Sequence, residues 1–310
     1  MDRYKNLMVG LNLSDQDVTT IRYAAMISRL AKTEKIYFIH VTENLEIPDD
    51  VRAEFPDLLE RADEFAVNEM KTMIDRYFDG YPGAERIHNV VEGVPLSVLL
   101  EWSHQKDIDL FLMGRKKESG ENSKLAVKLV RKAPCSVFIV PEGSEAKITR
   151  VLVPVDFSRN SAEALEVAIA FASTSTGAAI ECLHVYRLPT GYYKTGKTFE
   201  EFAAIMKGHA EKAYRNLIST FDHKGLSIAP LFELDNNPSK AIKAIAEKQR
   251  ADLLVMGARG KNDAAAVLLG SVTERLIRTT DIPLLAVKKK GASLGLLEAI
   301  LREAKIIYSA

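Results

Sequence analysis

The sequence predicts an α/β protein made of two repeated domains, each with a parallel sheet covered by helices on both faces. Short apolar segments such as 35–41 and 108–113 have the length and composition of buried strands. Amphipathic segments such as 161–173 and 239–249 alternate with them and have the period of helices. The length of 310 residues suits two domains of about 150 residues better than a single core.

The chain repeats itself along its length, which predicts two homologous domains. The repeated positions, 144 or 143 residues apart, include Asn12 and Asp156, His40 and His184, and Asp109 and Asp252. A polar stretch with glycine at 142–146 lies between the copies and has the composition of a linker. We therefore expect one domain over residues 1–143, a second over residues 147–290, and an amphipathic helical tail over residues 291–310.

The charges are balanced, with 42 lysine and arginine residues against 42 aspartate and glutamate residues. This balance provides no net field for nucleic acid or for an anionic membrane, so neither is expected as a partner. The sequence has no apolar run long enough to span a membrane and no signal-peptide core, which predicts a cytoplasmic protein. Cys135 and Cys182 lie in predicted strands without a partner motif and are expected to be reduced core residues.

A glycine-containing loop joins a predicted strand at 252–256 to a predicted helix at 272–280. Its special positions are Gly257, Gly260, Gly270 and Ser271. The first two glycines can adopt positive φ and allow a ligand to approach the backbone closely. The Gly-Ser pair offers a hydroxyl and unpaired N–H groups at the N-terminus of the helix. The loop therefore indicates an anion site and favours a polyphosphate.

The loop spacing, Gly-x2-Gly-x9-Gly-Ser, resembles the ATP-binding loop of the universal stress protein family. It is neither a Walker A sequence nor the Gly-x-Gly-x-x-Gly of dinucleotide-binding proteins. Other segments resemble the first, second, fourth and fifth strands of the same family, namely 151–155 followed by Asp156, 183–185, 252–257 and 282–287. The resemblance implies a Rossmann-like, doubly wound sheet of order 3-2-1-4-5 in each half, with a ligand crevice between strands one and four.

The resemblance also implies which residues of the second half contact ATP, with or without Mg²⁺. Asp156 is expected on the adenine and ribose side, and the backbone of Val185 at the adenine edge. The phosphate segment comprises Gly257, Gly260, Gly270, Ser271, Val272 and Thr273, with Arg259 beside it. In the helix the amides matter more than the side chains, although the threonine hydroxyl can add a donor. No catalytic residue and no metal ligand is assigned.

Ordinary structural roles for the same residues stay open. The glycines and Ser271 also suit a turn and a helix cap, and Arg259 also suits a solvated surface position. Asp156 also suits an Asx-type cap on the following helix, and one carboxylate can serve both roles. His184 and His40 share a repeat position, which favours a hydrogen-bonding or packing role at a strand end over catalysis.

The first half departs from the pattern where the nucleotide would bind. Asn12 replaces the aspartate, and the segment 113–134 spans 21 positions where the segment 256–283 spans 27. The Gly-Ser pair is missing, and Glu121 and Asn122 lie near its place, where a carboxylate would repel phosphate. The first half is therefore predicted to be a degenerate copy that has lost ordinary ATP binding.

We expect a tandem universal stress protein that binds ATP in its carboxyl-terminal half and has a regulatory role in the stress response through an unknown protein partner. The alternatives are an interaction module without nucleotide, with residues 191–194 as one contact, and a slow ATPase. The apolar fifth strands, 136–140 and 283–287, are expected to pair with each other as an internal pseudo-dimer. A homodimer involving the tail is the other assembly left open.

Overall fold

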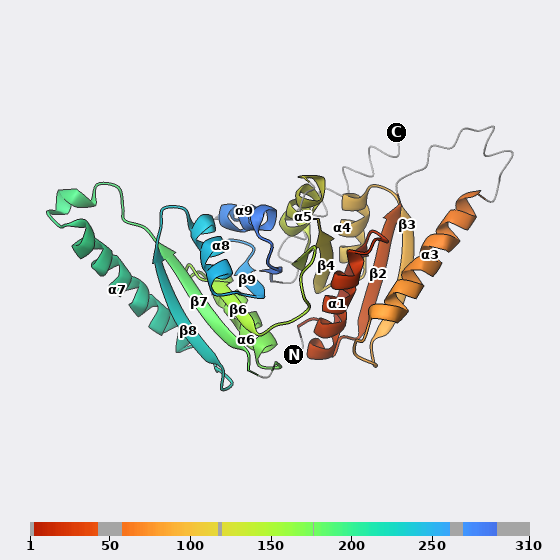
Figure 1. The fold of residues 1–310 in the computed structure, drawn as a ribbon, viewed down its shortest axis with the longest axis horizontal. Helices are drawn as coiled ribbons and strands as arrows, with labels where there is room; N and C mark the ends of the chain where they lie inside the picture. Colours follow the sequence, from red (N-terminus) through yellow and green to blue (C-terminus); the bar gives the residue numbers. More distant parts are fainter. Residues whose placement is uncertain (1–2, 43–57, 117–119, 176, 261–268, 290–310) are drawn as a thin grey trace. The chain divides into compact units, whose positions relative to one another are not determined.

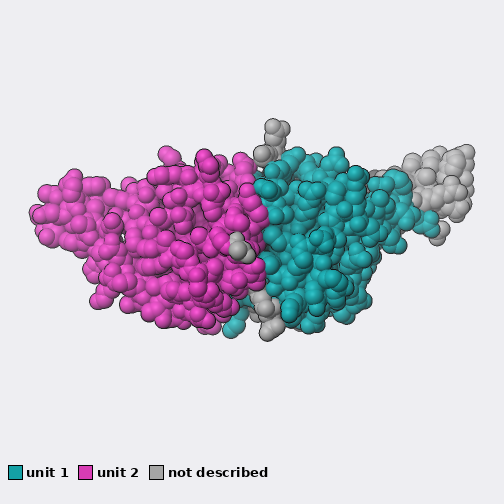
Figure 2. Space-filling view, turned by 60° about the horizontal axis from the view of Figure 1, so that its bottom comes forward, with its two compact units in different colours: residues 1–146, 289–310 teal, residues 147–288 magenta. Residues whose placement is uncertain are grey.

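The computed structural model describes residues 3–42, 58–116, 120–175, 177–260 and 269–289 of the chain. The chain forms two compact units, unit 1 of residues 1–146 with 289–310 and unit 2 of residues 147–288 (Figure 2). Strands and helices alternate in each unit, as expected for the α/β class. The helical tail expected over residues 291–310 lies outside the described residues.

Unit 1 contains a parallel sheet with the strand order β3-β2-β1-β4-β5 (Figure 1). Its elements are β1 (Asn6–Leu11), α1 (Asp17–Ala31), β2 (Lys35–Thr42), α3 (Leu58–Tyr77), β3 (Glu85–Glu92), α4 (Pro95–Gln105), β4 (Leu110–Arg115), α5 (Gly120–Lys132) and β5 (Ser136–Pro141). Helices α1 and α3 contact each other on one side of the sheet, and α4 and α5 contact each other on the other side. This is the predicted doubly wound arrangement.

Unit 2 repeats this topology, with the strand order β8-β7-β6-β9-β10. Its elements are β6 (Arg150–Pro154), α6 (Arg159–Ala172), β7 (Ala179–Tyr186), the 3₁₀-helix η1 (Tyr192–Thr195), α7 (Phe199–Ile218), β8 (Ser227–Leu234), α8 (Pro238–Lys248), β9 (Leu253–Gly257), α9 (Ser271–Thr279) and β10 (Leu284–Val287). The predicted order 3-2-1-4-5 is therefore present in both units.

Local sequence signals explain where the helices of unit 2 begin. The Ser158 side chain accepts a hydrogen bond from the Ser161 N–H and caps α6. Thr198 and Glu201 form a capping box at the start of α7. Asn237 caps α8 and is followed by a proline at the first helical position, where the missing N–H costs nothing. These caps determine the residues at which α6, α7 and α8 begin after the strands of the sheet.

A repeated aspartate holds the amino ends of the central strands together in both units. The Asp109 carboxylate accepts hydrogen bonds from the N–H groups of Lys5 and Asn6, at 2.9 and 2.8 Å. The Asp252 carboxylate accepts from the N–H groups of Thr149 and Arg150, each at 3.0 Å. Because these contacts lie where the strands start, they stabilise the edge of each sheet that is opposite to the predicted ligand crevice.

Both cysteines are buried thiols, as expected. Cys182 lies in β7, whereas Cys135 lies one residue before β5 and not in the strand itself. Burial raises the pKa of the Cys182 thiol to about 12, so this thiol stays protonated at neutral pH. Among the residues that the structure describes, no helix has the length and apolar character needed to cross a membrane.

Candidate functional site

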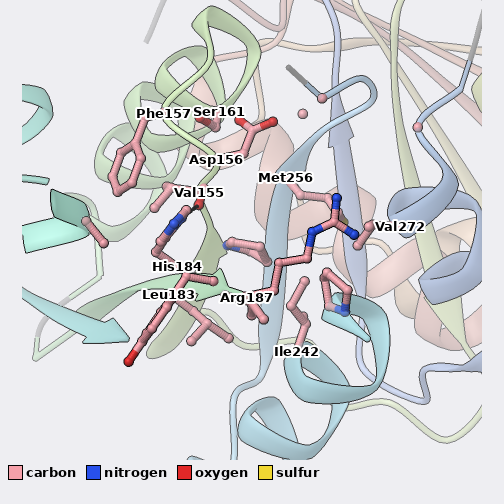
Figure 3. A pocket seen from close by; sticks show the side chains of 18 of the residues that line it. Val155, Asp156, Phe157, Ser161, Leu183, His184, Arg187, Ile242, Met256 and Val272 are labelled. Carbon is pink, nitrogen blue, oxygen red and sulfur yellow. Dashed lines mark hydrogen bonds between the residues drawn. The ribbon is translucent and has the colours of Figure 1, made fainter. Parts of the chain in front are cut away.

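A pocket of about 830 Å³ opens in unit 2 at the carboxyl ends of β6 and β9 (Figure 3). The chain leaves these neighbouring strands in opposite directions, which is the place where doubly wound sheets bind ligands. All nine residues predicted to contact a ligand line this pocket, namely Asp156, Val185, Gly257, Arg259, Gly260, Gly270, Ser271, Val272 and Thr273. Sequence positions up to 117 residues apart thus meet at one site.

The loop glycines Gly257 and Gly260 do not adopt the positive φ expected from the sequence. Neither Gly257 nor Gly260 has a positive φ, and Gly270 has φ −60° and ψ 136°, which any residue can adopt. A Cβ atom on Gly257 would lie 2.9 Å from the Asn160 Cβ and 3.0 Å from the Asn160 backbone carbon. Gly257 is therefore required by the close packing of β9 against α6, and the expectation of positive φ is wrong.

The first turn of α9 presents unpaired backbone donors to the pocket. Gly270 is the N-cap residue and provides no side chain to cap the helix. The first helical hydrogen bond runs from the Glu274 N–H to the Gly270 carbonyl oxygen at 2.9 Å. Among the described residues, no hydrogen bond uses the N–H groups of Ser271, Val272 or Thr273. Together with the helix dipole, these three donors can bind an anion.

The Thr273 hydroxyl is used within the protein. It donates a hydrogen bond to the Gly257 carbonyl oxygen at 3.1 Å and joins α9 to the end of β9. The hydroxyl donor expected for a ligand is therefore engaged elsewhere, while the Thr273 amide keeps its position in the first turn. The hydroxyl thus fixes the position of the amides relative to the sheet.

Asp156 combines a structural role with a place on the pocket wall. One carboxylate oxygen, Oδ1, accepts a hydrogen bond from the Ser158 N–H at 3.0 Å and forms an Asx turn before α6. The other oxygen, Oδ2, faces Gly260, because a Cβ atom on that glycine would lie 3.1 Å from it. The carboxylate therefore lies between the loop after β6 and the loop after β9.

The backbone of Val185 faces the pocket because β6 ends before it. The Leu183 carbonyl accepts from the Val155 N–H at 2.8 Å on the β6 side, whereas the Tyr186 carbonyl accepts from Asp235 on the β8 side. Alternation along a parallel strand then turns the N–H and C=O of Val185 toward the β6 side. The β6–β7 register stops at Leu183, so these groups lie beyond the end of β6.

His184 and His40 have the same role in their units. The Nδ1 atom of His184 lies 2.7 Å from the Val155 carbonyl oxygen, and that of His40 lies 2.9 Å from the Leu11 carbonyl oxygen. A carbonyl oxygen can only accept, so Nδ1 carries the proton in both rings. The His184 ring also packs on the Phe157 ring, with centroids 4.4 Å apart. The hydrogen-bonding role at the strand end, expected from the repeat, is present.

The sequence did not indicate the part of the pocket wall that comes from α7, from α8 and from the positions directly after β7 and β8. The lining residues there include Arg187, Met206, His209, Asp235 and Ile242. The residues from the helices have no motif, because a helix face that borders a pocket has the same amphipathic pattern as one that borders the core. The sequence could have indicated Arg187, because it lies only two positions after Val185, which was a predicted contact.

The corresponding region of unit 1 differs in charge. Asn12 lies after β1, and the neighbouring Asp17 is 1% exposed and accepts hydrogen bonds from the N–H groups of Asn12 and Ser14, at 2.7 and 3.2 Å. Burial raises the pKa of the Asp17 carboxyl. Ser161, 144 positions later, is a hydroxyl residue on the pocket wall of unit 2. Unit 1 therefore has a buried carboxyl group where unit 2 has a neutral side chain.

The chemical groups around the pocket determine which kind of ligand it can hold. In the described part of the chain, no group of three or more His, Cys, Asp or Glu side chains is arranged to hold a metal ion. The backbone donors of α9 suit an anion, and the apolar wall that includes Leu183, Met206 and Ile242 suits an uncharged ring. The geometry is thus that of a site for a ligand with an apolar part and an anionic part.

The fold and this pocket define a doubly wound α/β protein with a pocket at the switch point of its second sheet, the usual place of ligand sites in such folds. The sequence matches the model of the universal stress protein family over residues 3–141 and again over residues 147–288. The chain belongs to the universal stress protein family and contains two tandem copies of its domain.

Known relatives agree with this assignment. The chain is 29% identical to universal stress protein MJ0577 of Methanocaldococcus jannaschii over 158 residues, which is 46% of this chain and 96% of that protein. It is 22% identical to the universal stress protein E homolog of Haemophilus influenzae over 307 residues, 92% of this chain and 98% of the relative. The crystal structure of a universal stress protein from Archaeoglobus fulgidus matches with a TM-score of 0.64 and 21% identity, covering 92% of this chain and 96% of that one, which shows the shared fold.

Proposed function

We propose that unit 2 binds ATP in this pocket and that nucleotide occupancy controls a regulatory output of the protein in the stress response. The observation that carries the proposal is the first turn of α9, whose three N–H groups have no hydrogen-bond partner among the described residues and lie on the wall of a pocket of about 830 Å³. Such a turn stabilises phosphate through direct hydrogen bonds and through the helix dipole. The proposed contacts are the nine residues named above, and the proposed location is the cytoplasm.

The other wall of the pocket suits the nucleoside. The N–H and C=O of Val185 lie beyond the end of β6 and match the donor and acceptor pattern of an adenine edge. Asp156 lies between this strand end and the phosphate loop, at the position where a ribose hydroxyl would meet its carboxylate. Mg²⁺, if required, would arrive with the phosphates, because no cluster of metal ligands exists among the described residues.

We propose that unit 1 does not bind ATP in the equivalent place. Asn12 lacks the charge of Asp156, and the buried Asp17 carboxyl group opposes an anion. The sequence of this half also lacks the Gly-Ser pair and has Glu121 near its place, where a carboxylate would repel phosphate. Unit 1 would then act as a scaffold or as a contact surface.

A binding role is preferred to catalysis for a specific reason. In the described residues the Nδ1 atom of His184 is held by the Val155 carbonyl, and one oxygen of Asp156 is held by the Ser158 N–H. Both groups therefore have structural roles at the ends of β6 and β7, which favours binding over catalysis. Slow ATP hydrolysis stays an outcome of the test below.

An interaction module without nucleotide is the second candidate, and one observation favours it. Tyr193 in η1 and Phe199 at the start of α7 are 67% and 48% exposed. Tyr192 lies between them, with its ring centroid 6.2 Å from that of Tyr193 and 6.1 Å from that of Phe199. Exposed aromatic side chains of this kind are typical of protein contacts.

The first prediction concerns stoichiometry and separates these candidates. Calorimetric titration of the full chain with ATP should give one site per chain, because the first half lacks the Gly-Ser pair and has Asn12 in place of the aspartate. Two equivalent sites would contradict the proposed loss in unit 1, and no binding at all would favour the interaction module. Phosphate release measured under excess ATP distinguishes a binding protein, which releases essentially none, from a slow ATPase.

A further inference from the structure

Arg187 is a cation on the pocket wall for which the described part of the chain provides no charged partner. It follows β7 directly and lies two residues after Val185. Among the described residues it forms no hydrogen bond and no ion pair. Figure 3 shows its side chain extending across the pocket from the end of β7, with the guanidinium group on the side of Val272 and Met256.

The acidic groups of the pocket do not neutralise this cation. Asp156 accepts a hydrogen bond from the Ser158 N–H, and Asp235 accepts one from the Asn237 N–H at 2.7 Å. Both carboxylates thus have local structural roles, and neither pairs with Arg187. Arg259, on the loop after β9, lines the same pocket. An anion that entered would find two guanidinium groups and the first turn of α9 around it.

The repeat supports a role in ligand binding. The position 144 residues before Arg187 is Glu43, in the same register by which His40 precedes His184 and Val41 precedes Val185. This position is therefore positively charged in the second half, which has the proposed site, and negatively charged in the first half, which has Asn12 and Asp17. If this were only a solvated surface position, its charge would have no reason to differ between the halves together with the other features of the site.

We propose that Arg187 binds the phosphate chain of the nucleotide from the β7 side, opposite the amides of α9, and so makes the pocket selective for nucleotides over nucleosides. The proposal rests on the proposed function of the same pocket. A guanidinium group donates two parallel hydrogen bonds to phosphate oxygens, and its charge complements the neutral amides of the helix. Arg187 is then a specificity-determining residue outside the glycine loop.

The test compares Arg187→Gln with the wild-type chain in calorimetric titrations with ATP and with adenosine. ATP affinity should fall by about tenfold to a hundredfold, the range expected when a hydrogen-bonded charge is lost. Adenosine affinity should not change, because adenosine has no phosphate. Arg187→Lys should retain part of the ATP affinity, since it keeps the charge and loses the paired donors.

Arg215→Gln is the matched control, because Arg215 is exposed on α7, does not line the pocket and loses the same charge. It should bind ATP as the wild type does. The proposal for Arg187 is overturned if Arg187→Gln binds ATP with wild-type affinity, or if it weakens ATP and adenosine equally. A wild-type chain that binds neither ligand would overturn the proposed function as well, which distinguishes the two failures.

Discussion

Gly257 and Gly260 are both loop glycines of the same motif, yet they meet different neighbours. A Cβ atom on Gly257 would lie within 3.0 Å of backbone atoms of Asn160 and Arg259, which cannot move without shifting α6 or the loop. A Cβ atom on Gly260 would meet the Asp156 carboxylate at 3.1 Å, and a side chain can rotate. The first glycine is therefore required for packing, whereas the second controls the position of a proposed ligand contact.

A pair of alanine variants separates these two roles. Gly257→Ala should lower the free energy of unfolding of unit 2 by about 1–3 kcal/mol, because a methyl group is forced into a filled space. Gly260→Ala should leave stability nearly unchanged and should weaken ATP binding, because it displaces Asp156. Denaturant unfolding and calorimetric titration of both variants provide the measurements. Equal stability of the two variants would contradict the packing argument.

The nine residues predicted for the site all line the pocket, but their physical roles were harder to predict from sequence. The spacing of glycines located the loop because it depends only on sequence order. It did not reveal that Gly257 is required by Asn160 or that the Thr273 hydroxyl bonds to the Gly257 carbonyl, since both depend on how α6 and α9 pack on β9. Contacts between elements that are distant in sequence require the assembled fold.

At the scale of elements, the start of α9 is a helix N-terminus without a side-chain cap. Most helices gain stability when a serine, threonine, aspartate or asparagine bonds to one of the first amides. Helices α6, α7 and α8 of the same unit follow this rule, with Ser158, Thr198 and Asn237 as caps. In α9 the N-cap is Gly270, which leaves the amides available for a ligand at the cost of stability in the free protein.

Ser271→Pro tests whether these amides bind the ligand. Proline is well tolerated at the first helical position and removes only the N–H there. The residue before it, Gly270, already has the extended ψ of 136° that a following proline requires. We expect ATP affinity to fall by about tenfold or more, with little change in stability.

Ser271→Ala is the matched control for this variant, because it removes the hydroxyl and keeps the amide. It should retain most of the affinity if the backbone is the donor. If Ser271→Pro binds ATP as tightly as the wild type in the same titration, while circular dichroism shows an intact fold, the phosphate does not bind at the start of α9.

The existence and order of the strands and helices were well predicted, and their ends were less accurate. Apolar strands and amphipathic helices are visible in sequence because burial selects for them along the whole element. The predicted helix at 161–173 begins at Arg159, since the Ser158 cap lies earlier than the apolar pattern suggests. The wall formed by α7 was missed, because nothing in its sequence distinguishes residues that border a pocket from those that border the core.

At the scale of the whole molecule, β5 and β10 are the last strands in the order of their own sheets. Their sequences, Ser136–Pro141 and Leu284–Val287, contain no charged residue. Natural edge strands usually carry charges, bulges or prolines that prevent pairing with another strand, and the only proline of these two strands, Pro141, is the last residue of β5. The expected pairing of these two strands with each other therefore remains a prediction with a physical basis.

Side-chain substitution is a poor test of this pairing. Phe138 is fully buried, and its ring centroid lies 5.2 Å from that of Tyr23 inside unit 1. An aspartate at this position would unfold unit 1 whether or not the strands pair. The backbone amides offer a better test, since pairing of strands is a property of the backbone.

Hydrogen exchange at individual amides can decide the question. The Ser136 N–H donates to the carbonyl of Asp109, the residue before β4, and by alternation the N–H groups of Val137 and Ile139 point away from β4. On β10, the Pro283 and Val287 carbonyls accept from β9, so the N–H groups of Leu284 and Ala286 point away from β9. If β5 and β10 pair, these four amides should exchange as slowly as the amides of β4 and β9, because all of them would be hydrogen bonded. Rapid exchange at all four, together with two independently tumbling units in NMR relaxation, would show that the strands do not pair.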